Sequence, residues 1–393
     1  MAAQRINLNI NYKIFFIGLY IISLLFQFEI FPKEVFPFSS RLYYFLTPLG
    51  LLILLPRKII FRNLNIIDFY NYFILIFSIG TLFIYGINTA ILMAITSFCA
   101  FKIGEFSTRV INLQEFYKLV NKGFKLVIIF YLFRFFYNLE EYLLIFKYGR
   151  YAVQPTIDSP SDFLFIMSGG WNAEIALLGI FSTLILGSRI YRIFLIFFIF
   201  HVLIFESRVG FLILLMHLIH YIKFNFKILI KTFFFLILFY LIFNSFIDID
   251  DILMRRFNID SEYEILEEGH GRLFLWLEAL ELLKESLFGY GVGIGIIMAN
   301  NQSFFEIPEP NFHNIYLQIF VDLGIFGLIM FIGMFIYILK NYLNFKNNLL
   351  LGILIYFFIG FFQFTGYDIF IWFLIGFYIS FKKTNNGTQE KAF

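Results

Sequence analysis

The sequence predicts an all-α, polytopic membrane protein with about 12 transmembrane helices and a large non-cytoplasmic loop that contains an amphipathic helix. Hydrophobic residues make up 60% of the 393 residues and charged residues only 15%, whereas a soluble domain is about half apolar and about a quarter charged. Apolar runs of membrane-spanning length recur along the chain, and Lys and Arg concentrate on one side of the predicted topology. These three observations indicate that lipid, not water, surrounds most of the chain.

Each predicted span is an apolar stretch near the roughly 20 residues that cross a bilayer as a helix. The first stretch is expected to remain as a helix, because no small-residue cleavage site follows it. The predicted spans cover 14–31, 42–55, 69–87, 90–104, 124–139, 163–187, 190–205, 208–222, 229–247, 313–339, 349–366 and 368–381.

The basic residues give the predicted orientation. With both termini in the cytoplasm, 12 helices place 20 of the 30 Lys and Arg residues on the cytoplasmic side and 9 on the far side, with Arg134 inside a helix. This asymmetry follows the positive-inside rule. The far side then holds two long loops, at about 140–162 and about 248–312, and 382–393 forms a polar cytoplasmic tail that we expect to be disordered.

Charge and cysteine usage exclude several classes of function. The net charge of +3 is unlike that of a nucleic-acid-binding protein. The single cysteine, Cys99, permits neither a disulfide within the chain nor a thiolate metal site. His217 and His220 lie three residues apart on a predicted helix, but no carboxylate or cysteine completes a ligand set. We therefore expect no metal and no cofactor.

The far-side segment 248–312 contains its own predicted structure. After Gly269–His270–Gly271, residues 272–287 have the periodicity of an amphipathic helix that could lie in the membrane interface. The face predicted to be apolar carries Leu273, Trp276, Leu277, Leu280 and Leu283. The strip GYGVGIG at 289–295 follows this helix. It is predicted to be a tight turn, because a nucleotide-binding loop would follow a strand.

Three charged or titratable residues stand at predicted membrane boundaries. His313, where a helix begins, is either an interfacial histidine satisfied by water or a general base. Arg272 is either a snorkelling cation or a fork that binds an anionic phosphate. Arg208 follows Glu206 between two apolar runs, where it either pairs locally with Glu206 or is a functional charge.

Carboxylates raise further alternatives. Glu174 and Asp322 lie within apolar runs and could line a cavity. The cluster at 248–251 is either a divalent-cation site or a solvated loop end. The segment 248–312 carries 13 acidic and 4 basic residues, a net charge of −9. Because this charge repels anions at long range, binding of a phosphate by arginine would have to be local.

The motifs of the C-terminal half resemble those of O-antigen ligases and the related O-antigen polymerases. His313–Asn314, nine residues and then Gly324–Ile325–Phe326–Gly327 are similar to the signature of this family. Gly271–Arg272, the helix around Trp276 and the run Phe288–Gly289–Tyr290–Gly291 resemble its loop, and Ser207–Arg208 with Gly210 resembles its earlier motif. The similar segments lie in the family's order over 206–334.

The resemblance implies a membrane glycosyltransferase of the GT-C-like type that works on the periplasmic side of the bacterial inner membrane. His313 would be the base or the group that orients the acceptor hydroxyl, Arg208 and Arg272 would bind the pyrophosphate of the leaving group, and Asn314, Gly324 and Gly327 would support the site. The donor would be a glycan on undecaprenyl pyrophosphate. The partners would be the lipid bilayer and a chain-length regulator protein, and no nucleic acid.

Three functions remain open at this point. An O-antigen polymerase, which joins repeat units, is favoured because the loop has few cations to bind a phosphorylated core. An O-antigen ligase, which transfers the glycan to lipid A–core, would carry the same motifs. A flippase for the lipid-linked sugar is less favoured, because the chain lacks two similar halves with broken helices.

Overall fold

A computed structural model describes residues 2–28, 30, 41–55, 64–148, 166, 170–222, 272–302 and 311–389. Within these ranges the chain is helical and contains no β-strand, which confirms the predicted all-α class. The predicted span 229–247, the acidic stretch 248–268 and most of the loop 140–162 lie outside the described residues.

Six helices lie within the described residues of the N-terminal half. Asn65, Asn88 and Asn112 start three of the helices as N-caps, because each side-chain oxygen accepts a backbone N–H of the first turn. The helices of this half are α1 (Ala2–Leu25), α2 (Leu42–Leu54), α3 (Ile66–Tyr85), α4 (Thr89–Ser107), α5 (Leu113–Tyr137) and α6 (Leu139–Tyr148).

The C-terminal half contributes eight further described α-helices and a short 3₁₀ turn, η2 (Thr183–Ile185). One of them, α17, continues to Gln389, well beyond the predicted span end at 381 and into the predicted tail. The helices of this half are α7 (Gly170–Ser182), α8 (Arg189–Ile204), α9 (Arg208–Ile222), α13 (Arg272–Glu285), α14 (Ile294–Gln302), α15 (Ile315–Phe345), α16 (Asn348–Ile359) and α17 (Ile369–Gln389).

The helices agree with a membrane protein, but the count of 12 spans is not confirmed. Among the described residues, α3, α4 and α15 are long and apolar enough to cross a bilayer, and six further apolar helices are shorter. Large apolar side chains are left on the surface, such as Phe83 at 84% and Leu52 at 75% exposure. Because so much apolar surface is unfavourable in water, it fits contact with lipid.

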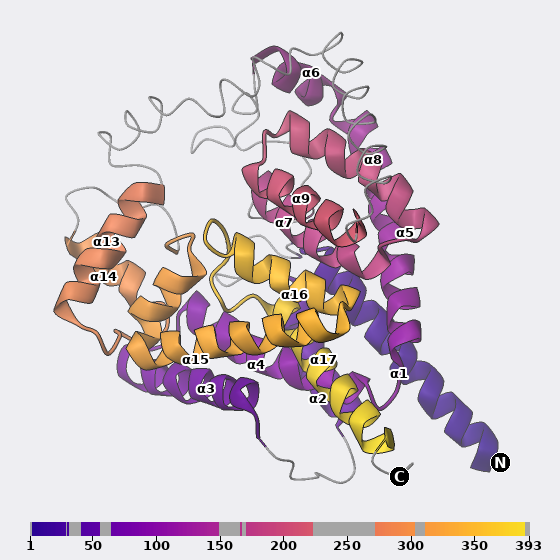
Figure 1. Ribbon diagram of the computed structural model, residues 1–393, viewed down its shortest axis with the longest axis horizontal. Coiled ribbons are helices and arrows are strands. Elements are labelled where there is room, and N and C mark those ends of the chain that lie inside the picture. The colour runs from indigo at the N-terminus through magenta and orange to yellow at the C-terminus, as the bar shows by residue number, and fades with distance from the viewer. Residues whose placement is uncertain are drawn as a thin grey trace.

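The helices pack around one large apolar core in which α4 and α17 make the most intimate pair. A Cβ at Gly104 would overlap the backbone of Phe373, and one at Gly376 would overlap the backbone of Phe101. Glycines at a crossing let two helix backbones approach closely, which strengthens packing in lipid. Figure 1 shows α3, α15 and α16 beside this pair, while α5 to α9 form a second group.

A smaller core lies where α13 and α14 meet the start of α15. The helix predicted over 272–287 is confirmed as α13, and its predicted apolar face packs in part: Trp276 and Leu283 join this core, whereas Leu277 and Leu280 are about half exposed. Leu275, Ala279 and Leu282 complete the packed face. Because leucines occur all around this helix, sequence periodicity could not decide which of them faces the protein.

Candidate functional site

His313 lies in a strained turn that precedes α15. Its φ of +50° is in the left-handed region, which non-glycine residues adopt only where their surroundings hold them. The backbone N–H of His313 donates to Oδ1 of Asn311 (2.8 Å), and Oδ1 of Asn314 caps the helix by accepting from Tyr316 N and Leu317 N at 3.0 and 3.1 Å. The turn is thus fixed on both sides of the imidazole.

Phe312, immediately before His313, is bonded from two directions. Its buried N–H donates to Oε1 of Gln318 (3.1 Å), and its carbonyl accepts from the indole Nε1 of Trp276 (3.1 Å). Trp276 lies one turn beyond Arg272 on α13, and residues four apart share a helix face. The first turn of α13, which carries Arg272, is therefore attached directly to the His313 turn.

Arg272 reaches from α13 toward the loop 360–368 that joins α16 to α17. Its Nη2 is 3.4 Å from Oε1 of Gln363, and its side chain is half-buried. The same loop holds the start of α15, because Ile315 N donates to the carbonyl of Gly360 (2.8 Å). Arg272 and His313 are thus brought to a single loop, although 40 residues separate them in sequence.

The loop 360–368 is itself organised by a buried carboxylate, Asp368. Its Oδ2 accepts the hydroxyl of Tyr356 (2.7 Å) and the backbone N–H groups of Thr365 (3.1 Å) and Gly366 (3.2 Å). Burial raises the pKa of the Asp368 carboxyl, and these hydrogen bonds lower it in part. Phe364 has a φ of +74°, so this loop is a second place where the backbone is held under strain.

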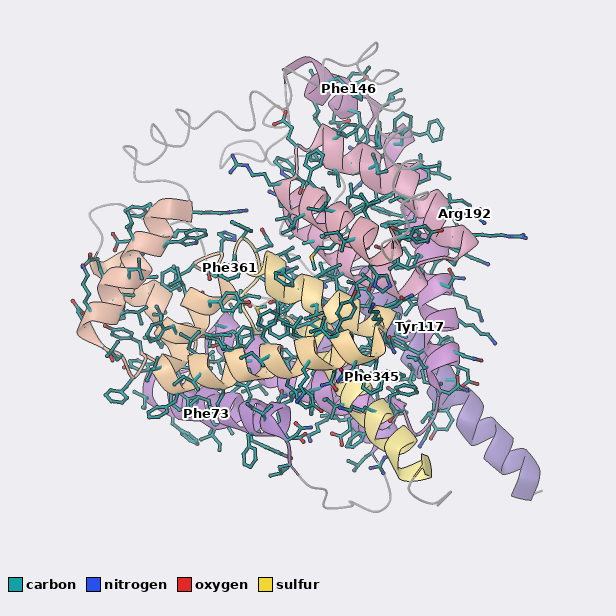
Figure 2. All side chains as sticks on the ribbon, viewed as in Figure 1. Phe73, Tyr117, Phe146, Arg192, Phe345 and Phe361 are labelled. Carbon is teal, nitrogen blue, oxygen red and sulfur yellow. The ribbon has the colours of Figure 1, made fainter. Side chains whose placement is uncertain are left out.

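Phe361 marks the outer side of this loop. Its ring stacks on Tyr316 with centroids 4.3 Å apart, and it remains 46% exposed. Figure 2 shows Phe361 at the end of α16 that faces α13. An exposed aromatic ring beside Arg272 and His313 offers an apolar surface at the same place.

Arg208 begins α9 and lies at the same end of the bundle. Near the other end of α9, His220 contacts the hydroxyl of Tyr342 (2.8 Å) and Oδ1 of Asn348, the first residue of α16 (3.2 Å). Helix α9 therefore runs antiparallel to α16, so its start lies toward Gly360. Arg208 is exposed there, and the preceding Glu206 has a φ of +49°. We call this end of the bundle the loop end; it comprises Arg208, Arg272, the turn 311–314 and the loop 360–368.

The predicted supporting glycines, Gly324 and Gly327, shape α15. Gly324 interrupts the helix with a φ of +71°, and a Cβ there would overlap the backbone of Phe288. A Cβ at Gly327 would overlap the side chain of Leu323. Residues 287–291 bond across the interruption through Tyr290 N to Val321 O (2.9 Å) and two similar bonds, which satisfy backbone groups that the broken helix leaves open.

The glycine strip 289–295 forms a tight turn that is hydrogen-bonded to the core. Its Val292 N–H donates to the hydroxyl of Thr81 (3.1 Å), and its Val292 carbonyl accepts from the amide of Asn88 (3.1 Å). Gly289, Gly291 and Gly293 all have positive φ, which glycine adopts without steric penalty. The strip therefore seats α13 and α14 on the ends of α3, α4 and α15.

Sequence reasoning missed several polar residues of the loop end. Gln363 and Asp368 lie where a single apolar span, 349–366, was expected to run into the next. The turn residues Thr365–Gly366 were the available signal. Gln318 and Tyr367 gave no signal at all, because only the fold brings them to Asp322, with Gln318 Nε2 at 2.9 Å and Tyr367 Oη at 3.1 Å from Oδ2.

Glu174, which was expected to line a cavity, forms a buried ion pair with Arg134. Nη1 of Arg134 lies 2.8 Å from Oε1 and 3.0 Å from Oε2 of Glu174, and Ile166 N donates to the same carboxylate (2.6 Å). The guanidinium lies over the ring of Tyr131, 4.6 Å from its centroid. Arg134 is 0% exposed.

The two helical histidines have local partners. Nδ1 of His217 is 3.1 Å from the hydroxyl of Tyr191, and His220 contacts Tyr342 and Asn348. In the part of the chain that the structure describes, three or more His, Cys, Asp or Glu residues do not gather as metal ligands would. The candidate cation cluster at 248–251 lies outside that part.

Comparison with known families connects this geometry to a class of protein. The family model described as O-antigen ligase matches residues 169–332, a segment that contains Arg208, Arg272, His313, Asn314, Gly324 and Gly327. Gln363 and Asp368 lie beyond it. A search of curated proteins finds no match. Residues 169–332 are therefore similar to the O-antigen ligase family, the family that the motifs of the chain resemble.

Proposed function

We propose that this protein is an O-antigen polymerase, which joins undecaprenyl-pyrophosphate-linked repeat units on the periplasmic side of the inner membrane. The observation that supports this most is the attachment of Arg272 and His313 to one loop, 360–368, at the loop end. The family match includes both residues. A guanidinium and an imidazole attached to one loop suit transfer of a sugar away from a diphosphate.

In this proposal His313 acts on the acceptor sugar. The imidazole accepts the proton of the acceptor hydroxyl while that oxygen attacks the anomeric carbon of the donor. The new glycosidic bond forms as the bond between the anomeric carbon and the pyrophosphate oxygen breaks. The strained turn around His313, bonded through Phe312 and Asn311, supports this role because it fixes where the imidazole stands.

Arg272 and Arg208 stabilise the leaving group. As the anomeric bond breaks, negative charge develops on the diphosphate, and guanidinium groups bind phosphate oxygens through paired N–H groups. Arg272 is half-buried, so its charge acts with less screening than that of a fully solvated residue. We propose that the two arginines supply the charge stabilisation that a metal ion gives in other transferases.

Polymerase is preferred to ligase because a ligase must also bind a phosphorylated lipid A–core, and the segment 248–312 carries 13 acidic residues against 4 basic ones. The description of the matching family keeps the ligase as the alternative. A flippase is the least favoured candidate, because the strained and charged residues gather at one end of the bundle. A chain-length regulator is a proposed partner.

Deletion of the gene in its host separates the three functions. A polymerase deletion loses the lipopolysaccharide ladder and leaves core with a single repeat unit. A ligase deletion leaves bare core with glycan stranded on the lipid carrier. Single repeats trapped on the cytoplasmic face identify a flippase. Either of the last two results rejects the proposed function.

Replacement of His313 tests the base directly. We expect His313→Ala to reduce polymerisation of purified lipid-linked repeats in nanodiscs by about 10²- to 10⁴-fold, the usual contribution of a general base. The matched control is His220→Ala. It removes a histidine near the end of α9 that lies away from Arg208, and it should leave polymerisation unchanged. Full activity of His313→Ala at a normal level in the membrane would remove the proposed base.

A further inference from the structure

Two sets of hydrogen bonds from the loop end meet at the carboxylate of Asp322. It is 0% exposed and lies in the interrupted turn of α15, two residues before Gly324. Burying a carboxylate inside an apolar bundle is costly, so such a residue is a candidate for a functional role. Neither the proposed base nor the proposed arginines make direct use of it.

One arm from Asp322 leads to the His313 turn. Oδ2 of Asp322 accepts from Nε2 of Gln318 (2.9 Å), and Oε1 of the same amide accepts from Phe312 N (3.1 Å). Both ends of the Gln318 amide are therefore used, which fixes its orientation. Because Phe312 precedes His313, this arm holds the left-handed turn that carries the imidazole.

The second arm leads to the loop 360–368. The hydroxyl of Tyr367 donates to the same Oδ2 of Asp322 (3.1 Å), and the carbonyl of Tyr367 accepts from Oγ of Ser97 (2.5 Å). Tyr367 is fully buried and adjoins Asp368, which organises the rest of this loop. The loop carries Gln363, the contact of Arg272.

We propose that Asp322 is a positioning residue. It holds the His313 turn in a fixed position relative to the loop 360–368, which contacts Arg272, so that His313 and Arg272 meet the same lipid-linked glycan. This inference rests on the proposed function. The single oxygen Oδ2 joins the two arms through Gln318 and Tyr367. Breaking one arm should therefore disturb one group, and removing Asp322 should disturb both.

The two arms predict different kinetic changes. Gln318→Leu should lower kcat about tenfold or more with little change in KM for the lipid-linked donor, since small misplacement of a catalytic group has effects of this order. Tyr367→Phe should mainly raise KM for the donor, by about three- to tenfold, the equivalent of one lost hydrogen bond. Asp322→Ala should show both changes, and Asp322→Asn, which keeps an acceptor oxygen, should retain more activity than Asp322→Ala.

Tyr70→Phe is the matched control for Tyr367→Phe. Tyr70 is also a fully buried tyrosine, and among the described residues its hydroxyl has no hydrogen-bond partner. Removing that oxygen should leave kcat and KM unchanged. If Tyr70→Phe raises KM as much as Tyr367→Phe does, the second arm is rejected.

A double-mutant cycle distinguishes positioning from general stability. If Asp322 acts through His313, Asp322→Ala should lower kcat little further in a His313→Ala background, because residues of one network are not additive. Independent, multiplicative losses would overturn the proposal. So would wild-type kinetics of Asp322→Ala. If Asp322→Ala fails to reach the membrane, wild-type kinetics of both Gln318→Leu and Tyr367→Phe would overturn it instead.

The outcomes also separate this inference from the proposed function. Full activity of His313→Ala rejects the base and, with it, any positioning of that base. Loss of activity in His313→Ala together with wild-type kinetics in Asp322→Ala rejects the inference alone. The expected pattern is a loss in both variants, with the kcat and KM changes divided between the two arms.

Discussion

Two arginines of this protein occupy opposite kinds of environment. Arg134 is completely buried in the group of helices α5 to α8, where a carboxylate binds it through two short contacts and an aromatic ring covers it. Arg272 is half-buried at the loop end and reaches an amide oxygen at 3.4 Å. The first charge is neutralised within the fold, whereas the second is held near a turn that is itself under strain.

The difference separates a structural charge from one suited to binding. A buried ion pair stabilises the fold only as a pair, because either member alone would be an uncompensated charge in an apolar medium. A partly exposed guanidinium presents a planar fork of N–H donors whose geometry matches a phosphate. We therefore expect replacements at the two arginines to fail in different ways.

The largest effect is expected at the buried pair. Arg134→Ala should reduce the free energy of unfolding by about 3–5 kcal/mol, because Glu174 is left buried without its partner. Thermal unfolding in detergent and the level in the membrane would measure this loss. The double variant Arg134→Met with Glu174→Leu should recover much of the stability. Failure of the double variant to recover would mean that the pair also positions something else.

The next largest effect is expected at Arg272. Arg272→Ala should reduce polymerisation by about 10²- to 10³-fold, the effect of removing one charge-stabilising donor from a transition state. Arg272→Lys should recover only part of this loss, because an ammonium lacks the planar fork. The thermal midpoint should stay near that of the unaltered protein. A large drop in stability would place Arg272 in the same structural class as Arg134.

A smaller effect is expected at the amide that Arg272 contacts. Gln363→Leu removes one long hydrogen bond, so it should reduce activity about two- to tenfold. The change should fall on KM for the lipid-linked donor. If Gln363→Leu is as damaging as Arg272→Ala, the amide contacts substrate instead of orienting the guanidinium.

The smallest effect is expected at Lys284, which forms a surface ion pair with Glu281 on α13. The two side chains are 69% and 63% exposed. Such pairs contribute roughly 0–1 kcal/mol. Lys284→Ala should therefore leave activity and the thermal midpoint unchanged, which makes it the baseline for the other three variants. A measurable loss of activity would extend the functional surface along α13.

Much of the fold follows from hydropathy, because lipid selects apolar runs whatever their partners. Every predicted span within the described residues overlaps a helix, and the site motifs lie at helix starts, as at Arg208, Arg272 and Ile315. Hydropathy predicts the approximate length of each helix, but not which of its faces packs against the rest of the protein. The sequence therefore did not show that Leu277 and Leu280 of α13 stay partly exposed while Leu283 packs, and the loop 360–368 was assigned to predicted spans.

The polar contacts could not be predicted, since each joins positions that are remote in sequence. Trp276 meets Phe312 across 36 residues and Arg272 meets Gln363 across 91. Nothing in the local sequence of Gln363 signals its contact with Arg272. Glu174 was noticed because a carboxylate in an apolar run is costly, and Arg134 was the one basic residue placed inside a predicted helix, but the sequence could not show that the two form a pair.

The contact between Gly289 and Gly324 has a consequence for redesign. Helix α13 is seated on α15 there with backbone against backbone, so no side chain lies between them that could be exchanged. A laboratory that wished to retarget the proposed polymerase to a different sugar would have to leave this backbone contact untouched. Variation would instead be directed at the exposed aromatic rings nearby, such as Phe288 and Phe361.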